Sequence, residues 1–223
     1  MKFKHALLTM ISAAFIVVSC GGPQGERATT SDEQAVIESK GTVYTAETSS
    51  SKIEWVGTKP TGQHNGTINV TKGEIFVENG EITGGEMVID MKSIQVLDLT
   101  DAETNAKLRN HLLSPDFFET ETYPEARFVF TSVKPYTGEQ TGAVNFTHTV
   151  SGNLTMKDAT RNVTFPAMID IQENAMKAVT DNFIIDRSEW NVKFGSRKFF
   201  DNLADNFIHD DISLRIMFLA NKE

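Results

Sequence analysis

The chain of 223 residues has one cysteine, few histidines and none of the common catalytic motifs. Cys20 has no second cysteine to pair with, which excludes an internal disulfide. There is no nucleophile elbow, no phosphate-binding glycine loop and no His-Glu-x-x-His motif. His64, His111, His148 and His209 lie far apart in sequence, so their spacing does not indicate a metal site. We therefore expect no metal and no other cofactor, and nothing in the sequence requires catalysis.

Basic residues are scarce relative to acidic ones. Lys and Arg total 21 against 30 Asp and Glu, which gives a formal net charge of −9 at pH 7. Residues 1–20 hold two lysines and no acid, so the remainder of the chain is two units more negative, at −11. This balance argues against nucleic acid as a partner and against electrostatic docking on anionic lipid.

The apolar run near the N-terminus, Ala6 to Val18, is too short to span a bilayer. Lysines precede it, and Val17-Val18-Ser19-Cys20 at its end resembles a lipobox. We therefore predict that residues 1–20 are a lipoprotein signal peptide and that Cys20 is lipidated, which would anchor the protein to a membrane. The alternative is an ordinary secretory signal that happens to end at a cysteine.

The region after Cys20 is expected to divide into a tether and one domain. Gly21 is not an inner-membrane retention signal in the usual sense, so we expect the outer membrane, with the protein facing the periplasm. Residues 21–42 are rich in Gly, Ser, Thr and acids without an apolar period, which predicts a flexible tether. Residues 43–223 are long enough for one domain with a sizeable core.

Strand patterns dominate this domain. Apolar residues alternate with polar ones over 144–156, 163–171 and 212–220. Asn79-Gly80 predicts a two-residue hairpin turn, and Gly84-Gly85 predicts a bulge. One stretch, about Asp101 to Leu113, has helical spacing. Many strands, one helix and one core imply an antiparallel barrel or a sandwich, and the pattern alone does not decide between them.

The segment Arg109–Ser132 is unusually rich in aromatic residues. Ser114-Pro115-Asp116 predicts a helix start, with a hydroxyl cap and a proline at the first helical position. Phe117 and Phe118 follow in a turn too short to hide them, so they are expected to pack into a hydrophobic interior. Tyr123-Pro124 then forces extended backbone ahead of an alternating strand.

Three segments together resemble the YceI family, lipocalin-like bacterial proteins that bind polyisoprenoid lipids. Arg109–Ser132 resembles the central family signature. Gly152–Phe165 is similar to its Gly-x-Leu-Thr-x-x-Gly-x-Thr-Arg-x-Val hairpin, although Asp158 stands where the family usually has Gly. Ile185–Val192 resembles a third family stretch, and the likeness covers roughly residues 43–220. It implies an all-β, antiparallel, eight-stranded lipocalin-like barrel with one short helical insertion.

The inward face of the strands supplies a set of candidate lining residues. The alternation of side chains along the strands alone leaves two alternatives, a filled core or a lined pocket. The family resemblance favours a pocket for an isoprenoid tail. The candidates for the tail pocket are Trp55, Ile68, Val70, Phe128, Phe130, Phe146, Val150, Leu154, Phe165, Phe183, Ile185, Leu214 and Ile216.

Polar candidates are fewer. His148 lies on the apolar face of a strand, where it is either a hydrogen-bonded core histidine or a headgroup contact. Arg109, His111 and Arg187 are the other headgroup candidates, although each arginine could instead pair with a nearby acid. Trp190 and Phe194 lie in a stretch that we expect to fold over one mouth of the barrel as a lid.

The resulting hypothesis is non-catalytic binding, storage or transport of an isoprenoid lipid, such as a polyprenyl phosphate or an isoprenoid quinone. Two alternatives stay open: an enzyme acting on such a molecule, and a packed structural or adhesive envelope lipoprotein. The sequence leaves a homo-dimer open as well.

Overall fold

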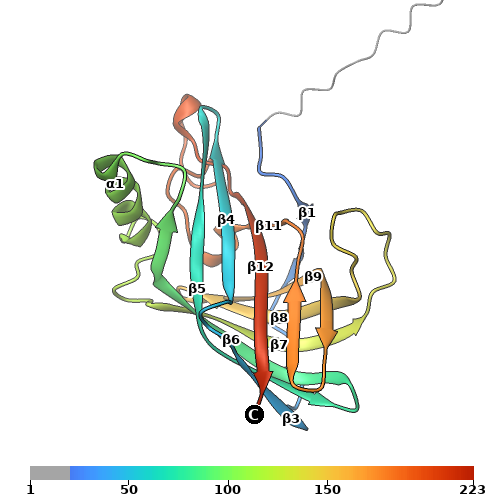
Figure 1. Cartoon of the computed structure of the whole chain (residues 1–223). Coiled ribbons are helices and arrows are strands. Elements are labelled where there is room, and N and C mark those ends of the chain that lie inside the picture. Colours follow the sequence, from blue (N-terminus) through green and yellow to red (C-terminus); the bar gives the residue numbers. More distant parts are fainter. Residues whose placement is uncertain (1–20) are drawn as a thin grey trace, which may run out of the picture.

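Antiparallel strands make up most of residues 21–223, the part of the chain that this computed structural model describes (Figure 1). The strands are β1 (Glu26–Arg27), β2 (Thr29–Ser31), β3 (Thr42–Ala46), β4 (Lys52–Lys59), β5 (Gly62–Glu78), β6 (Glu81–Val96), β7 (Glu125–Pro135), β8 (His148–Met156), β9 (Ala159–Ile171), β10 (Ala175–Val179), β11 (Phe183–Asp186) and β12 (Asp211–Lys222). The α-helix is α1 (Ala102–Leu113), and 3-10 turns span Arg187–Trp190 and Ala204–Asn206. Within this part of the chain, no helix has the length and apolar character needed to cross a membrane.

The strands close into a ring. Strands β4 to β10 pair in succession, and β12 pairs with both β10 and β4. Within residues 21–223 the ring therefore contains eight strands: β4, β5, β6, β7, β8, β9, β10 and β12. This confirms the predicted all-β, antiparallel, lipocalin-like architecture with one helical insertion.

Strand β12 has different partners at its two ends. Residues 217–221 pair with β10, whereas residues 211–214 pair with β11 on the same side of the ring. Its opposite edge pairs with β4 over residues 212–217 and with β3 over residues 220–222. The ring is therefore built from different strands at its two levels, here called the lower half (around β10) and the upper half (around β11) (Figure 1).

The predicted turn and bulge are both present. Asn79 and Gly80 have φ of 54° and 82°, the left-handed pair that a tight hairpin between β5 and β6 requires. The pairing of β5 with β6 shifts between Phe76 and Val77, opposite the predicted bulge at Gly84-Gly85. In the turn between β8 and β9, the left-handed residue is Lys157, at φ 52°, rather than Asp158.

The predicted helix start at Ser114 is wrong, because Ser114 instead ends α1. Its backbone N–H and its hydroxyl both donate to the carbonyl of His111. The chain then turns back so that Phe118 N–H donates to Leu112 O, which places Phe117 and Phe118 in the core, only 7 % and 8 % exposed. Burial of two phenylalanines outweighs the local helix-start signal, while the predicted packing of these rings is confirmed.

Residues 21–42, expected to be a flexible tether, are instead docked on the ring. β1 pairs with β11 in parallel, and β2 pairs with residues 162–164 of β9, the stretch of its edge that β10 does not reach. Ala28, between the two short strands, is buried in the core. The composition gave no apolar period because this segment pairs through its backbone, satisfying strand edges that would otherwise be open.

The docked N-terminal segment generates a testable prediction. Ala28→Asp should lower the free energy of unfolding by about 1–3 kcal/mol, because it places an unpaired polar group in the core. Gly22→Asp is the matched control, since a Cβ at Gly22 meets nothing within 4 Å. Denaturant titration measures both, and equal stability of the two variants would show that the segment is a free tether.

Candidate binding cavity

The upper half of the ring encloses a cavity of about 280 Å³. Strands β4, β5, β6, β7, β8, β11 and β12 form its walls, and α1 with the turn after it covers one side. Its apolar lining consists of Ile53, Trp55, Ile68, Ile89, Met91, Ile94, Leu108, Leu112, Phe117, Phe118, Ala126, Leu154, Met156, Ile185, Ile208, Ile212 and Leu214. The lower half holds a void of about 40 Å³, so side chains nearly fill it.

Polar side chains gather at one end of the cavity. Lys59 and His64 come from the hairpin end of β4 and β5, where Gly57 pairs with His64 and Lys59 with Gly62. His111 comes from the last turn of α1. Arg187 precedes the segment of residues 191–210, here called the mouth segment, and His209 lies near the end of that segment. Lys59 is a cation and the three histidine rings can donate hydrogen bonds, so this end suits a hydrogen-bond-accepting group.

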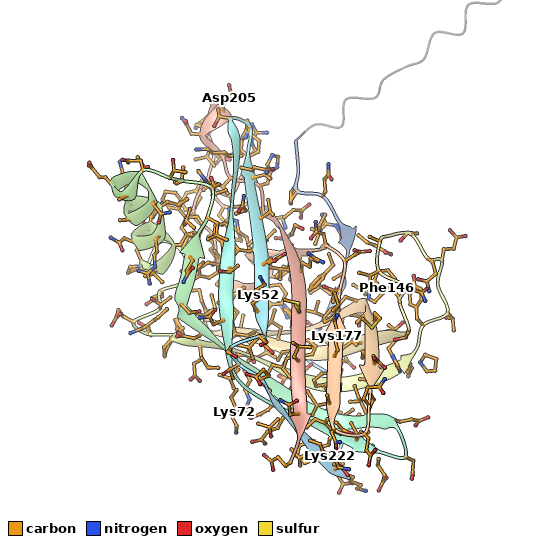
Figure 2. All side chains as sticks on the ribbon, in the orientation of Figure 1. Lys52, Lys72, Phe146, Lys177, Asp205 and Lys222 are labelled. Carbon is orange, nitrogen blue, oxygen red and sulfur yellow. The ribbon has the colours of Figure 1, made fainter. Side chains whose placement is uncertain are left out.

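The predicted tail residues divide between the two halves. Trp55, Ile68, Leu154, Ile185 and Leu214 line the large cavity. Phe128, Phe130, Val150, Phe165 and Ile216 line the lower void, and Val70 and Phe183 are buried in the core. Phe146 precedes β8 and packs on Tyr136, with ring centroids 5.4 Å apart; Figure 2 shows it on the side of the ring, away from the upper end.

The predicted headgroup residues also separate. His111 and Arg187 line the cavity, whereas Arg109 and His148 do not. Arg109 donates to the carbonyls of Ile94 and Lys92 and borders an outer groove. His148 lies at the start of β8 with its Nδ1 2.8 Å from Thr147 Oγ1, and partial burial lowers its pKa. Lys59, His64 and His209 were missed, since no local pattern relates these three positions.

Arg187 is fully engaged in holding the mouth segment. It is 1 % exposed, and its guanidinium donates to the carbonyls of Val192, Phe194, Ile208 and His209 at 2.6–3.3 Å. Its Nη2 lies 3.4 Å from Asp210 Oδ1. Burial lowers the pKa of Arg187, although Asp210 and Asp186 act in the opposite direction. Arg187 therefore positions the segment that covers the cavity, and its N–H groups are largely committed to that task.

The predicted lid residues lie at different depths. Trp190 is fully buried, and its indole N–H donates to Leu154 O at 2.8 Å, so it fixes the base of the mouth segment to β8. Phe194 is 38 % exposed and packs against the rings of His111 and Phe117, with centroids 4.6 and 5.5 Å apart. Phe194 therefore lies at the rim, whereas Trp190 lies beneath it.

His64 is held by a carboxylate. Its Nδ1 lies 2.8 Å from Asp98 Oδ2, while the other oxygen of Asp98 accepts from Asn65 N–H. Partial burial opposes ionisation of Asp98, but the hydrogen bonds from Asn65 and His64 outweigh it and keep the pKa of this carboxyl below its usual range. The carboxylate thus fixes the orientation of the His64 ring at the rim.

Two buried polar atoms in the cavity lining have no hydrogen-bond partner among the described residues: Trp55 Nε1 and Thr58 Oγ1. Their residues are 7 % and 6 % exposed. A buried donor without an acceptor costs about 1–3 kcal/mol, and such groups are rare in folded proteins. Both residues border the cavity, but their positions alternate along β4, so Trp55 is the one on the inward face, where an acceptor on a bound molecule would satisfy its N–H.

Comparisons with known proteins agree on one family. The family model described as "YceI-like domain" matches residues 44–220. UPF0312 proteins of two Pseudomonas putida strains are 32% and 31% identical to the chain over 102 residues, 46% of this chain and 47% of each relative. The chain thus spans about half the length of the curated relatives it matches.

Two solved structures share the fold. BcnA of Burkholderia cenocepacia has a TM-score of 0.59 at 20% identity, over 78% of this chain and 99% of that one. A polyisoprenoid binding domain from Saccharophagus degradans, implicated in plant cell wall breakdown, has a TM-score of 0.58 at 15% identity, over 81% and 98%.

Arg187→Met should release the mouth segment. The change leaves four carbonyls without their donor and Asp210 without its counter-charge, so we expect a loss of about 3 kcal/mol in unfolding free energy. Amide hydrogen exchange over residues 191–210 should accelerate with it. Arg109→Met is the control, because Arg109 also donates to two carbonyls but on the outer face. Unchanged exchange in the Arg187 variant would contradict this role.

Proposed function

The chain belongs to the YceI-like domain family, and on this premise we propose that it binds an isoprenoid lipid, with the tail in the upper cavity and the headgroup toward its polar end. The ligand class is a polyprenyl phosphate or an isoprenoid quinone, held without covalent bonding. Support comes from the apolar cavity and, by fold, from the polyisoprenoid binding domain of Saccharophagus degradans. The presence of the cavity argues against the alternative of a fully packed structural barrel.

The driving force is burial of the tail. Each CH₂ removed from water contributes about 0.8 kcal/mol, so the part of the tail inside the cavity dominates the gross binding energy. Ordering of the chain offsets much of this gain. Because the walls carry no directional contacts for a hydrocarbon, they retain a tail without selecting its chemistry, and selection falls to the polar atoms.

Trp55 carries the proposal beyond a generic apolar pocket. A hydrocarbon filling the cavity would leave the Trp55 N–H unsatisfied, whereas a carbonyl, hydroxyl or phosphate oxygen would accept from it. The ligand we propose is therefore amphipathic, with an oxygen that reaches the depth of Trp55. The basic side chains at the rim would neutralise any remaining negative charge.

The protein acts, in this proposal, as a carrier or store in the cell envelope. Cys20 would attach it to the outer membrane facing the periplasm, and Cys20 itself lies outside the described residues. The acidic balance of the chain is the basis for expecting no nucleic-acid partner.

The test of the ligand is native mass spectrometry on protein secreted to the periplasm by a signal without the lipobox and purified without detergent. A bound mass that matches a prenyl quinone or polyprenyl phosphate in the organic extract supports the proposal. Gly57→Phe should abolish this mass, because Gly57 lines the cavity and a Cβ there meets nothing within 4 Å. Val56→Phe, on the opposite face of β4, should keep it. An apo protein that also fails to take up added isoprenoids would refute lipid binding.

Trp55→Phe should discriminate between ligands. Loss of the indole N–H should weaken binding of an oxygen-bearing isoprenoid about tenfold, because one hydrogen bond to a buried acceptor is lost. Binding of an isoprenoid hydrocarbon of equal length should not weaken. Competition titrations with both ligands on wild type and variant measure this, and equal losses for both would place the headgroup away from Trp55.

A further inference from the structure

The N-terminus of the described chain lies at the mouth of the cavity. A Cβ built on Gly21 would lie 3.9 Å from Nε2 of His209, and His209 lines the cavity at its polar end. In Figure 1 the first described residues enter the fold from the same end as the mouth segment. Cys20, the predicted site of lipidation, immediately precedes Gly21 in the sequence.

Only a few residues connect Gly21 to the part of the chain that is fixed on the ring. Gln24 O accepts from Ser213 Oγ at 2.8 Å, and Glu26 N–H donates to Asn182 O at 3.2 Å. From Glu26 onward the chain pairs with β11 and then with β9. An anchor at Cys20 is therefore about five residues from fixed strand structure, a span of at most about 18 Å. A tether this short cannot let the ring turn its opposite end to the membrane.

Exposed apolar side chains gather at the same end. Among residues 21–223, five large apolar side chains are exposed, and Phe194, Phe199 and Phe200 of the mouth segment are three of them, at 38 %, 45 % and 49 %. Leu97 is a fourth, and its N–H donates to the carbonyl of Asn65, beside His64 at the rim. We call these four residues the mouth surface. Val36 is the exception, next to Ile37, whose N–H donates to Phe130 O.

We propose that the mouth surface rests on a lipid bilayer, so that the cavity opens directly into the membrane. Phenylalanine and leucine side chains exposed together on one end of a protein are typical of an interaction site, and the short N-terminal connection puts a bilayer within their reach. This rests on the proposed function in two respects, that Cys20 is lipidated and that the cavity exchanges lipid. Exchange would then proceed between cavity and bilayer without moving the tail through water.

The contact is apolar rather than electrostatic. Arg197 lies over the Phe207 ring at 3.6 Å and donates to Ala204 O. Lys198 pairs with Asp186 and donates to Ser188 Oγ. Lys193 lies over the Phe199 ring, and Asp201 and Asp205 offset the remaining charge. Two of the three cations in the segment are thus engaged internally, so the association should persist in high salt and on neutral lipid.

Fluorescence quenching by lipid tests the orientation. Full-length lipidated protein on phosphatidylcholine vesicles would carry one label, at Asp205→Cys or at Lys72→Cys, which lie toward opposite ends of the molecule in Figure 2. Lipids with a quencher in the acyl chain should quench the label at 205 and spare the label at 72, at low and high salt alike. Equal quenching at both sites, or stronger quenching at 72, overturns the proposal.

Exchange kinetics give the second measurement. Replacing both Phe199 and Phe200 by serine should slow transfer of a bound isoprenoid to the vesicles about tenfold, because the apolar contact is weakened. Val36→Ser, at a side chain that is more exposed than either phenylalanine but away from the mouth, should leave the rate unchanged. If the labels at position 205 on two molecules quench each other and the lipid does not quench them, a second copy of the chain covers the mouth surface. That result would overturn the bilayer contact. Orientation is read without any bound isoprenoid, so it can fail while mass spectrometry still finds a ligand, and the reverse also holds.

Discussion

The structure depends on the pairing of β12, which closes the sheet into a ring through β10 at one end and carries β11 at the other. Its edges need partners along their full length, because unpaired backbone groups in a strand are costly and invite wrong pairing. The lower part pairs with β10 and the upper part with β11. The N-terminal strand β1 pairs with β11, and β2 pairs with β9. The lower half is packed by rings such as Phe128, Phe165 and Phe218, and the upper half is left hollow.

A hollow of this kind persists only if something covers it. Here two covers meet at the rim: the turn after α1, which carries Phe117, and the mouth segment, which is tied down by Arg187. A buried guanidinium is a weak source of net stability, since its desolvation offsets its bonds. Its contribution is geometric. One planar guanidinium donates to four backbone carbonyls at positions that belong to no strand or helix and would otherwise lack a donor.

Sequence patterns predicted the secondary-structure elements well. They did not predict at which level along the axis of the ring each side chain lies. Local signals sufficed for α1, for the Asn79-Gly80 turn and for the alternation on β9 and β12. They failed where the outcome depends on distant partners. Alternation along a strand shows which side chains point inward, but not at which level of the ring they lie. The predicted tail residues therefore fall partly in the cavity and partly in the packed lower half. Residues 21–42 gave no apolar signal because backbone pairing holds them, and His64 and His209 meet only through the closure of the ring.

The depth of the unpaired donors bears on what a ligand can reach. Trp55 and Lys59 are four residues apart on β4, roughly 13 Å at the rise of a strand. A single phosphate or carbonyl cannot contact both. If the headgroup satisfies Trp55, it lies below the rim, and Lys59 and the rim histidines remain beside whatever the mouth touches. The polar groups of the cavity then lie at two depths, with selection of the ligand at Trp55 below and the rim side chains above, beside the mouth surface, whose proposed contact with the bilayer is apolar.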